Sequence, residues 1–224
     1  MIYLKRVNRN KDQSQELSGS SLRRVGKYHG VRYMQDQFLI RKIVFLAVFV
    51  SFSACLQVYM DAFIYWQDGL FSEFWRLWTA HWVHVGWMHY FLNMLAFICL
   101  PFIFPRVSLW HFVALLLALP PLISLSFYIF LPDVEAYAGL SGVLHGAYAS
   151  IACVHLLYKR ERRFATFVLL LILSKLVWEN TFGSMGTAQL IGSPVLVEAH
   201  LLGVIWGIVL AVIYVIGSYF IAEK

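Results

Sequence analysis

Charged side chains are scarce in this chain of 224 residues: they make up 13% of it, whereas hydrophobic side chains make up 60%. The mean hydropathy is +0.68, which predicts a polytopic membrane protein. Ten of the 18 lysines and arginines precede residue 43, accompanied by three acids. Because this basic excess belongs to one end of the chain, it indicates contact with an anionic membrane surface and does not indicate a nucleic-acid partner.

Cysteine is equally sparse. Cys55, Cys99 and Cys153 all lie in apolar runs and lack the spacing of a metal site. Thiols buried in helices usually behave as small hydrophobic side chains. We therefore expect no disulfide, no metal and no cofactor.

The chain divides into a polar end and an apolar remainder. Residues 1–42 lack a sustained apolar period and predict a basic, largely disordered cytoplasmic tail, and residues 43–224 predict a membrane domain. A membrane-spanning helix needs about 20 apolar residues. We expect an all-α bundle of six transmembrane helices, at roughly 43–60, 87–104, 109–131, 139–157, 164–178 and 197–220.

The loops between these spans differ in charge. With the tail inside, the inner loops hold Arg106 and the basic cluster at 159–163, whereas the outer connections hold Arg76 alone among several acids, with Glu179 assigned to the outer side. This distribution follows the positive-inside rule. Both termini are therefore expected in the cytoplasm, with Ser141 near the outer face.

Two outer segments are longer than simple turns. Residues 61–86 carry several aromatic side chains among a few charges, which is typical of an amphipathic element in the headgroup region. Residues 179–196 are rich in Gly, Ser, Thr and Asn and predict a flexible loop that could gate access.

A serine stands between two glycines at the start of the fourth predicted span, in Gly-Leu-Ser-Gly at residues 139–142. Glycine lets the backbone approach a reacting group closely. A helix N-terminus also offers free N–H groups and the positive end of the helix dipole, which suit an oxyanion. Serine alone is a weak signal, because membrane serines usually bond to their own helix. A nucleophilic Ser141 therefore requires a base.

Polar residues gather at the outer ends of two other predicted spans. His84, His89 and Asn93 begin the second span, and the last two are four residues apart, hence on one helix face. His200 begins the sixth span. Ionisable groups inside a membrane are costly, so several of them at one depth favour a functional site.

Small residues provide a way to bring His200 to Ser141. Gly203 and Gly207 share a helix face with His200, and Gly142 and Gly146 form the same spacing below Ser141. Such seams permit close contact between helices. Packing the two seams together would place the histidine beside the serine.

The whole set resembles the rhomboid family of intramembrane serine proteases, over about residues 43–220. The resemblance implies a rhomboid-like six-helix fold in which Ser141 is the nucleophile and His200 its general base, a dyad without an acidic third member. The motifs that carry it are Trp75-Arg76, His84, His89, Asn93, Gly139-Leu140-Ser141-Gly142 and Ala199-His200 followed by Gly203 and Gly207.

The resemblance also implies roles for the remaining residues. His89 and Asn93, with the backbone N–H of Ser141, would form the oxyanion hole. His84 would brace the first outer loop, and Trp75 and Arg76 would belong to the membrane-embedded part of that loop.

Two positions depart from the family pattern. His145 stands four residues after Ser141, where rhomboids often have tyrosine; it either packs beneath His200 or tunes the pKa of His200, and packing is favoured over a role as the base. The Glu- and Gly-bearing motif that many rhomboids carry in the second span is absent, and Cys-Leu-Pro occupies residues 99–101.

The sequence around these departures is similar to one subgroup, the rhombosortases. The similar segments are residues 139–146, Trp178-Glu179, residues 190–192 and residues 198–201. The resemblance implies a protease of the bacterial inner membrane with its active site toward the periplasm. Its substrates would be exported proteins anchored by a single-pass C-terminal sorting tail with a Gly-Gly motif.

Two alternatives compete with a protease. One is a catalytically silent rhomboid-like protein that binds or escorts membrane clients, although the intact Ser141 and His200 argue against it. The other, far behind, is a haem- or metal-binding membrane protein that uses His84, His89, His145 and His200.

Overall fold

The computed structural model of the protein describes residue 37 and residues 39–222. The chain forms two compact units, residues 1–47 and residues 48–224. In the first unit, residues 39–47 are helical, and most of the predicted tail (1–42) lies outside the described residues. The second unit carries all of the candidate site residues.

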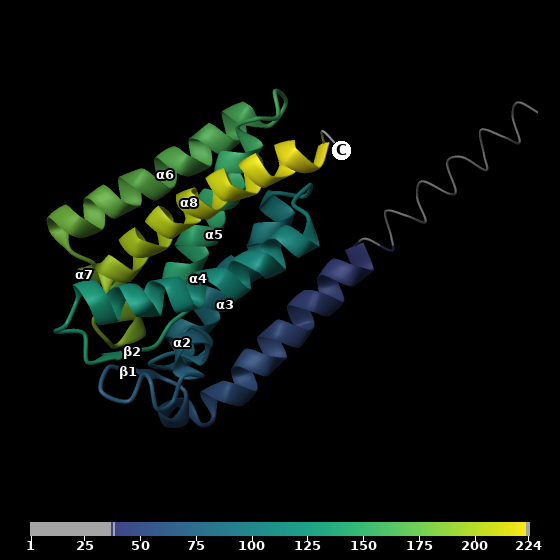
Figure 1. Cartoon of the computed structure of the whole chain (residues 1–224). Helices are drawn as coiled ribbons and strands as arrows, with labels where there is room; N and C mark the ends of the chain where they lie inside the picture. Colours follow the sequence, from purple (N-terminus) through teal and green to yellow (C-terminus); the bar gives the residue numbers. More distant parts are fainter. Residues whose placement is uncertain (1–36, 38, 223–224) are drawn as a thin grey trace, which may run out of the picture. The chain divides into compact units, whose positions relative to one another are not determined.

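Helices make up most of the second unit (Figure 1). The long helices are separated by short connections, except on the side where the two short strands and the short helices lie. The elements are η1 (Met60–Ala62), β1 (Tyr65–Trp66), α2 (Arg76–Thr79), α3 (Trp87–Ile103), α4 (Leu109–Phe130), β2 (Ala136–Tyr137), α5 (Ser141–His155), α6 (Arg162–Phe182), α7 (Met185–Ile191) and α8 (Val197–Ala222).

Each of the six predicted spans contains a helix. Among the described residues, four of these helices are long and apolar enough to cross a membrane: Leu39–Gln57, α4, α6 and α8. Helix α3 is a shorter apolar helix, and α5 has 15 residues. The structure therefore shows a multi-helix, all-α membrane protein, and the count of six spans stays a prediction.

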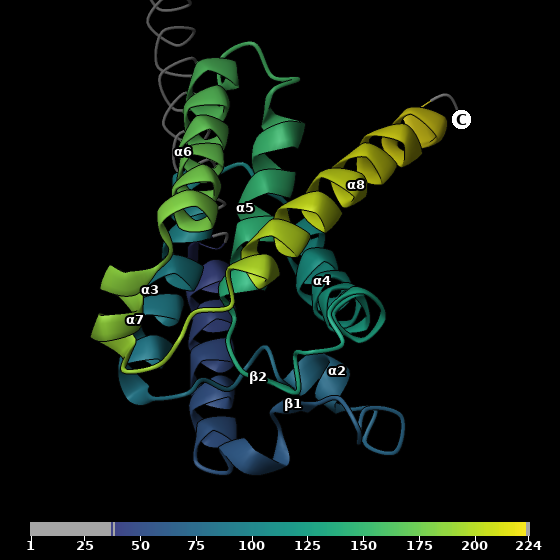
Figure 2. The ribbon, with the colours of Figure 1, turned by 90° about the vertical axis from the view of Figure 1, so that its left-hand side faces the viewer.

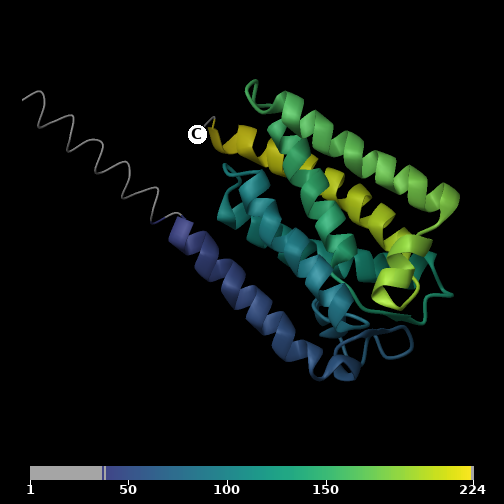
Figure 3. The ribbon, with the colours of Figure 1, turned by 180° about the vertical axis from the view of Figure 1, so that it is seen from behind.

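Helix α5 occupies the middle of the bundle. It packs against α8, α6, α4 and α3, and Figures 2 and 3 show it enclosed by these helices from two sides. Its buried positions are mostly glycine, alanine and serine, and small side chains allow four helices to approach one axis.

A short antiparallel pairing joins two outer segments that are far apart in sequence. Tyr65 pairs with Tyr137, and Trp66 pairs with Ala136. The predicted all-α fold did not include this pairing, because two-residue strands leave no alternating pattern in a sequence. Its position matters, because β2 leads directly into the loop before Ser141.

The first outer segment, residues 61–86, is built from turns and short elements and is not one amphipathic element. Arg76, which is buried, holds this segment together: its guanidinium donates to the backbone oxygens of Ile64 (2.7 Å) and Asp61 (3.1 Å) and pairs with Glu73 (2.6 Å). Trp75 lies beside it, exposed, and its indole N–H donates to the oxygen of Ala62 at 3.2 Å. These contacts fix the loop expected around Trp75 and Arg76.

The predicted flexible loop at residues 179–196 is wrong in two respects. Helix α6 continues to Phe182, beyond its predicted end at residue 178, and Met185–Ile191 forms α7. The helix continues because Lys175 and Glu179, the charged residues near its end, are one turn apart and form an ion pair. Pairing lowers the free-energy cost of placing these two charged side chains in a membrane helix, and this cost is the reason why the sequence predicted a helix end at residue 178.

Candidate active site

Ser141 is the first residue of α5, and the loop before it is tightly fixed. Gly139 has a φ of +149°, which disfavours other residues, and a Cβ there would lie 2.8 Å from Cε1 of His89. The Gly139 N–H donates to the oxygen of Ala80 at 3.0 Å. Burial raises the pKa of Tyr137 to about 12, so its phenol stays protonated and donates to the oxygen of Gly139 at 2.7 Å. The nucleophile position is thus held by backbone geometry.

The predicted glycine seams do meet. A side chain at Gly203 would overlap the carbonyl of Gly142, and one at Gly207 would overlap the carbonyl of Gly146. Helices α5 and α8 therefore touch backbone to backbone below the site. This contact sets the distance between their first turns, where Ser141 and His200 lie.

His200 contacts Ser141 directly. Its Nε2 lies 2.9 Å from the Ser141 Oγ, and its side chain is buried. Its other nitrogen, Nδ1, lies 2.8 Å from Oε2 of Glu179. An ionised carboxylate only accepts hydrogen bonds, so Nδ1 carries the proton. The neutral imidazole then accepts at Nε2 from the serine hydroxyl, which is the arrangement a general base requires.

The expected dyad did not include a carboxylate, and the structure places one, Glu179, beside His200. Glu179 was assigned to the outer connection after the fifth span, whereas the structure places it inside α6 and buries it. A signal for it does exist in the sequence. The positions 165, 169, 172 and 176 are apolar at helical spacing, and the next step of this stripe is Glu179.

His145 packs on His200, as one of the two expectations had it. The two rings are stacked, with centroids 4.1 Å apart and 18° between their planes. The Nδ1 of His145 lies 2.7 Å from the backbone oxygen of Ser141, one turn earlier in the same helix. His145 therefore packs beneath the His200 imidazole. Because its Nδ1 faces the backbone oxygen of Ser141, it is poorly placed to act as a base toward the Ser141 hydroxyl.

His89 and Asn93 both lie beside Ser141. His89 lines a pocket of about 360 Å³ together with Ser141, and Asn93 lines a second one of about 250 Å³ that also reaches Ser141. The Asn93 amide donates to the oxygen of His89 at 3.0 Å. Because the amide nitrogen carries two hydrogens, one stays available for a substrate oxygen.

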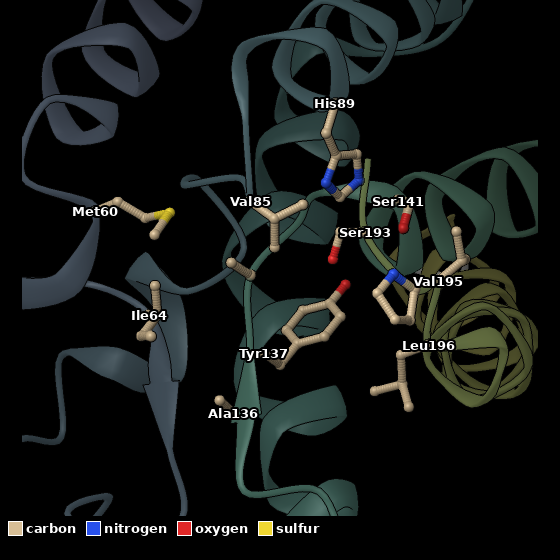
Figure 4. A pocket seen from close by; sticks show the side chains of 12 residues that line it. Met60, Ile64, Val85, His89, Ala136, Tyr137, Ser141, Ser193, Val195 and Leu196 are labelled. Atoms are coloured by element: carbon tan, nitrogen blue, oxygen red, sulfur yellow. The ribbon is translucent and has the colours of Figure 1, made fainter. Parts of the chain in front are cut away.

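The larger pocket opens between the outer loops and the start of α5 (Figure 4). Its lining is apolar apart from a few polar groups, and the picture shows the His89 ring and the Tyr137 hydroxyl on the side where Ser141 lies. The segment before α8 closes one wall with Ser193, Val195 and Leu196. An extended peptide segment entering this pocket would meet Ser141.

His84 lies behind the site. It is buried, and its ring meets that of His89 edge to face with centroids 5.1 Å apart. Burial, and secondarily the neighbouring His89, lowers the pKa of His84 to about 3, so it is neutral at physiological pH. The Gln57 side chain bonds both the N–H and the carbonyl of His84, at 2.7 and 2.6 Å. These two bonds fix the backbone at His84, and the bracing role of its side chain stays a prediction.

Among the described residues, two of the four histidines considered from the sequence, His145 and His200, belong to a group that could hold a metal ion. Within residues 39–222, the group whose ligand atoms lie within 4.8 Å of one another is His145, Glu179 and His200. Both nitrogens of His200 and both carboxylate oxygens of Glu179 already have hydrogen-bond partners. A metal there would displace at least one of these hydrogen bonds.

Comparison with known proteins adds the family. A search among curated proteins gives no match. The family profile of the Rhomboid domain matches residues 72–217, which is well over half of the chain and includes Ser141, His200, His89 and Asn93. The chain therefore belongs to the rhomboid family, whose members are in general intramembrane serine proteases.

Proposed function

We propose that the protein is an intramembrane serine endopeptidase that uses Ser141 and His200. The observation that carries this proposal is the 2.9 Å contact between the Ser141 Oγ and the His200 Nε2, inside a family of intramembrane proteases. Serine is a poor nucleophile until a neutral imidazole accepts its proton. His200 is placed to do so, because its other nitrogen already carries a proton.

The chemistry follows from the positions of these groups. As the Ser141 oxygen bonds to the substrate carbonyl carbon, its proton moves to His200 Nε2, which later gives it to the leaving amine. The carbonyl oxygen takes up negative charge at the N-terminus of α5, where the Ser141 N–H, the spare Asn93 hydrogen and His89 would stabilise it. Water then hydrolyses the acyl-enzyme by the same route.

For the substrate, we propose exported proteins anchored by a single-pass C-terminal tail with a Gly-Gly motif. The resemblance to rhombosortases supports this class, as does helix physics. Glycine is a poor helix former, so a Gly-Gly step lets a spanning helix unwind into the extended form that a pocket beside Ser141 would accept. The location would be a bacterial inner membrane, with the site toward the periplasm.

The test is a reporter with an exported domain, a Gly-Gly motif, a spanning helix and a basic end, co-expressed with wild type or Ser141→Ala. We expect cleavage by wild type alone, and loss of cleavage when the reporter carries Leu-Leu in place of Gly-Gly. Uncut reporter, together with fluorophosphonate labelling of wild type but not of Ser141→Ala, would keep the protease and reject the sorting tail. Loss of both cleavage and labelling would favour the silent, client-binding relative.

A further inference from the structure

Glu179 is a buried carboxylate with two different partners. Its side chain is 5% exposed; Oε2 lies 2.8 Å from His200 Nδ1, and Oε1 pairs with Lys175 Nζ. Burying a carboxylate is costly unless each oxygen is paired. Both oxygens of Glu179 are paired, and one of them is committed to the histidine that contacts Ser141.

An ion pair that only made the surface of α6 more polar would have both of its side chains exposed. Lys175 and Glu179 are one turn apart on the same helix, as in many surface pairs. The Lys175 side chain is 46% exposed, however, whereas Glu179 points inward and is nearly fully enclosed. The pair therefore runs from the helix surface into the site, and Glu179 is at its inner end.

The packing of α6 fixes this inward direction. Leu176 is buried with Ala149 of α5 and Val204 of α8, and Leu169 and Ile172 pack against this cluster. All three α6 side chains belong to the stripe that Glu179 ends. Because Leu176 is fixed between α5 and α8, the next position of the stripe must face His200.

We propose that Glu179 is a positioning residue that completes a Ser141–His200–Glu179 triad. This inference rests on the protease function proposed above. Glu179 accepts the Nδ1 proton and thereby keeps the lone pair at Nε2, facing Ser141. When Nε2 takes the serine proton, the carboxylate stabilises the imidazolium and stays ionised. No proton passes to Glu179.

Lys175 makes the proposal sharply testable. In Glu179→Gln, the amide has one oxygen for two neighbours that both need an acceptor, Lys175 Nζ and His200 Nδ1–H. An ammonium group has donors only, so the oxygen turns to Lys175 and the NH₂ group faces His200. The imidazole must then accept at Nδ1 and carry its proton at Nε2, which is the wrong tautomer for a base.

The experiment measures kcat and KM on a cleavable anchored substrate for wild type, Glu179→Gln, Lys175→Met and the double variant. We expect Glu179→Gln to lower kcat by about 10²–10⁴. KM should not change, because neither residue lines the pockets that reach Ser141. Lys175→Met alone should cost less than tenfold. The double variant should regain at least tenfold over Glu179→Gln, because the amide oxygen is then free to face His200.

Leu169→Ala is the packing control, because Leu169 packs against the same cluster about three turns before Glu179. It weakens the packing of α6 without moving Glu179 or His200, so it should reduce the final fraction of protein labelled by a fluorophosphonate but not the kcat of the labelled fraction. Wild-type kcat in Glu179→Gln would overturn the proposal. A parallel fall of kcat and labelled fraction, with no recovery in the double variant, would also overturn it by showing a packing role. An inactive, unlabelled wild type would overturn the protease function and this inference with it.

Discussion

The Ser141 hydroxyl lies at the first residue of α5, where the helix leaves backbone N–H groups without carbonyl partners. Asn93 and His89 approach the same point from α3, a different helix. A negative charge on a substrate oxygen would thus meet backbone and side-chain donors that are already in place. Donors that need no reorganisation during the reaction contribute most to stabilising its transition state.

Replacing Asn93 by alanine tests this reading. Loss of one oxyanion donor usually lowers kcat by about 10²–10³, and we expect a loss in that range with little change in KM. Asn180→Ala is the matched control, because the Asn180 amide also donates to a carbonyl one turn earlier, that of Leu176, at 2.8 Å. Cleavage kinetics of purified enzyme measure both variants. Equal losses in the two variants would assign Asn93 a role in its helix and none in the reaction.

Between elements, the closest approach in the site region is that of α5 and α8. The glycines of the two seams let carbonyls and Cα atoms touch, and such contacts supply dispersion energy in lipid, where no hydrophobic effect drives helices together. The distance between Ser141 and His200 depends on this contact, so the packing of α5 against α8 sets the geometry of the site.

Gly203→Ala should therefore destabilise the protein. The added methyl group overlaps the carbonyl of Gly142, and overpacking of this kind costs about 1–3 kcal/mol or more. We expect a lower melting temperature in detergent, together with reduced cleavage as α8 moves outward. Gly217→Ala on the same helix is the control, since nothing lies within 4 Å of a Cβ there. It should be neutral or slightly stabilising, and equal effects of the two changes would refute the seam.

Sequence patterns predicted the seam well and the end of α6 poorly, for the same physical reason. The four-residue spacing of Gly203 and Gly207 predicts a close helix contact by itself, without knowledge of the neighbouring helices. The apolar stripe of α6 points to Glu179, but the role of this carboxylate depends on two partners, Lys175 and His200 on α8. Read without those partners, a carboxylate looks like the end of a span. The β1–β2 pairing was missed likewise, because it depends on contact between distant segments.

At the scale of the whole molecule, the arrangement of charges predicts which side of the membrane the site faces. The connection between α5 and α6 carries Lys159 and Arg160, and α6 begins with Arg162, whereas the connection between α4 and α5 carries Asp133 and Glu135. Ser141 follows the acidic connection. The positive-inside rule predicts that the basic connection stays in the cytoplasm and the acidic one is translocated, which would let Ser141 meet the exported substrates proposed above.

Single cysteines test this orientation, in a background with Cys55, Cys99 and Cys153 replaced by serine. A cysteine at Asp133, which is exposed in the outer connection, should react with a membrane-impermeant maleimide in intact spheroplasts. A cysteine at Lys159 should react only after the membrane is permeabilised. The reverse pattern would place Ser141 at the cytoplasmic face, where an exported protein with a sorting tail could not reach it. The protease chemistry would survive that result, because it depends on contacts within the second unit, but the proposed substrate class would not.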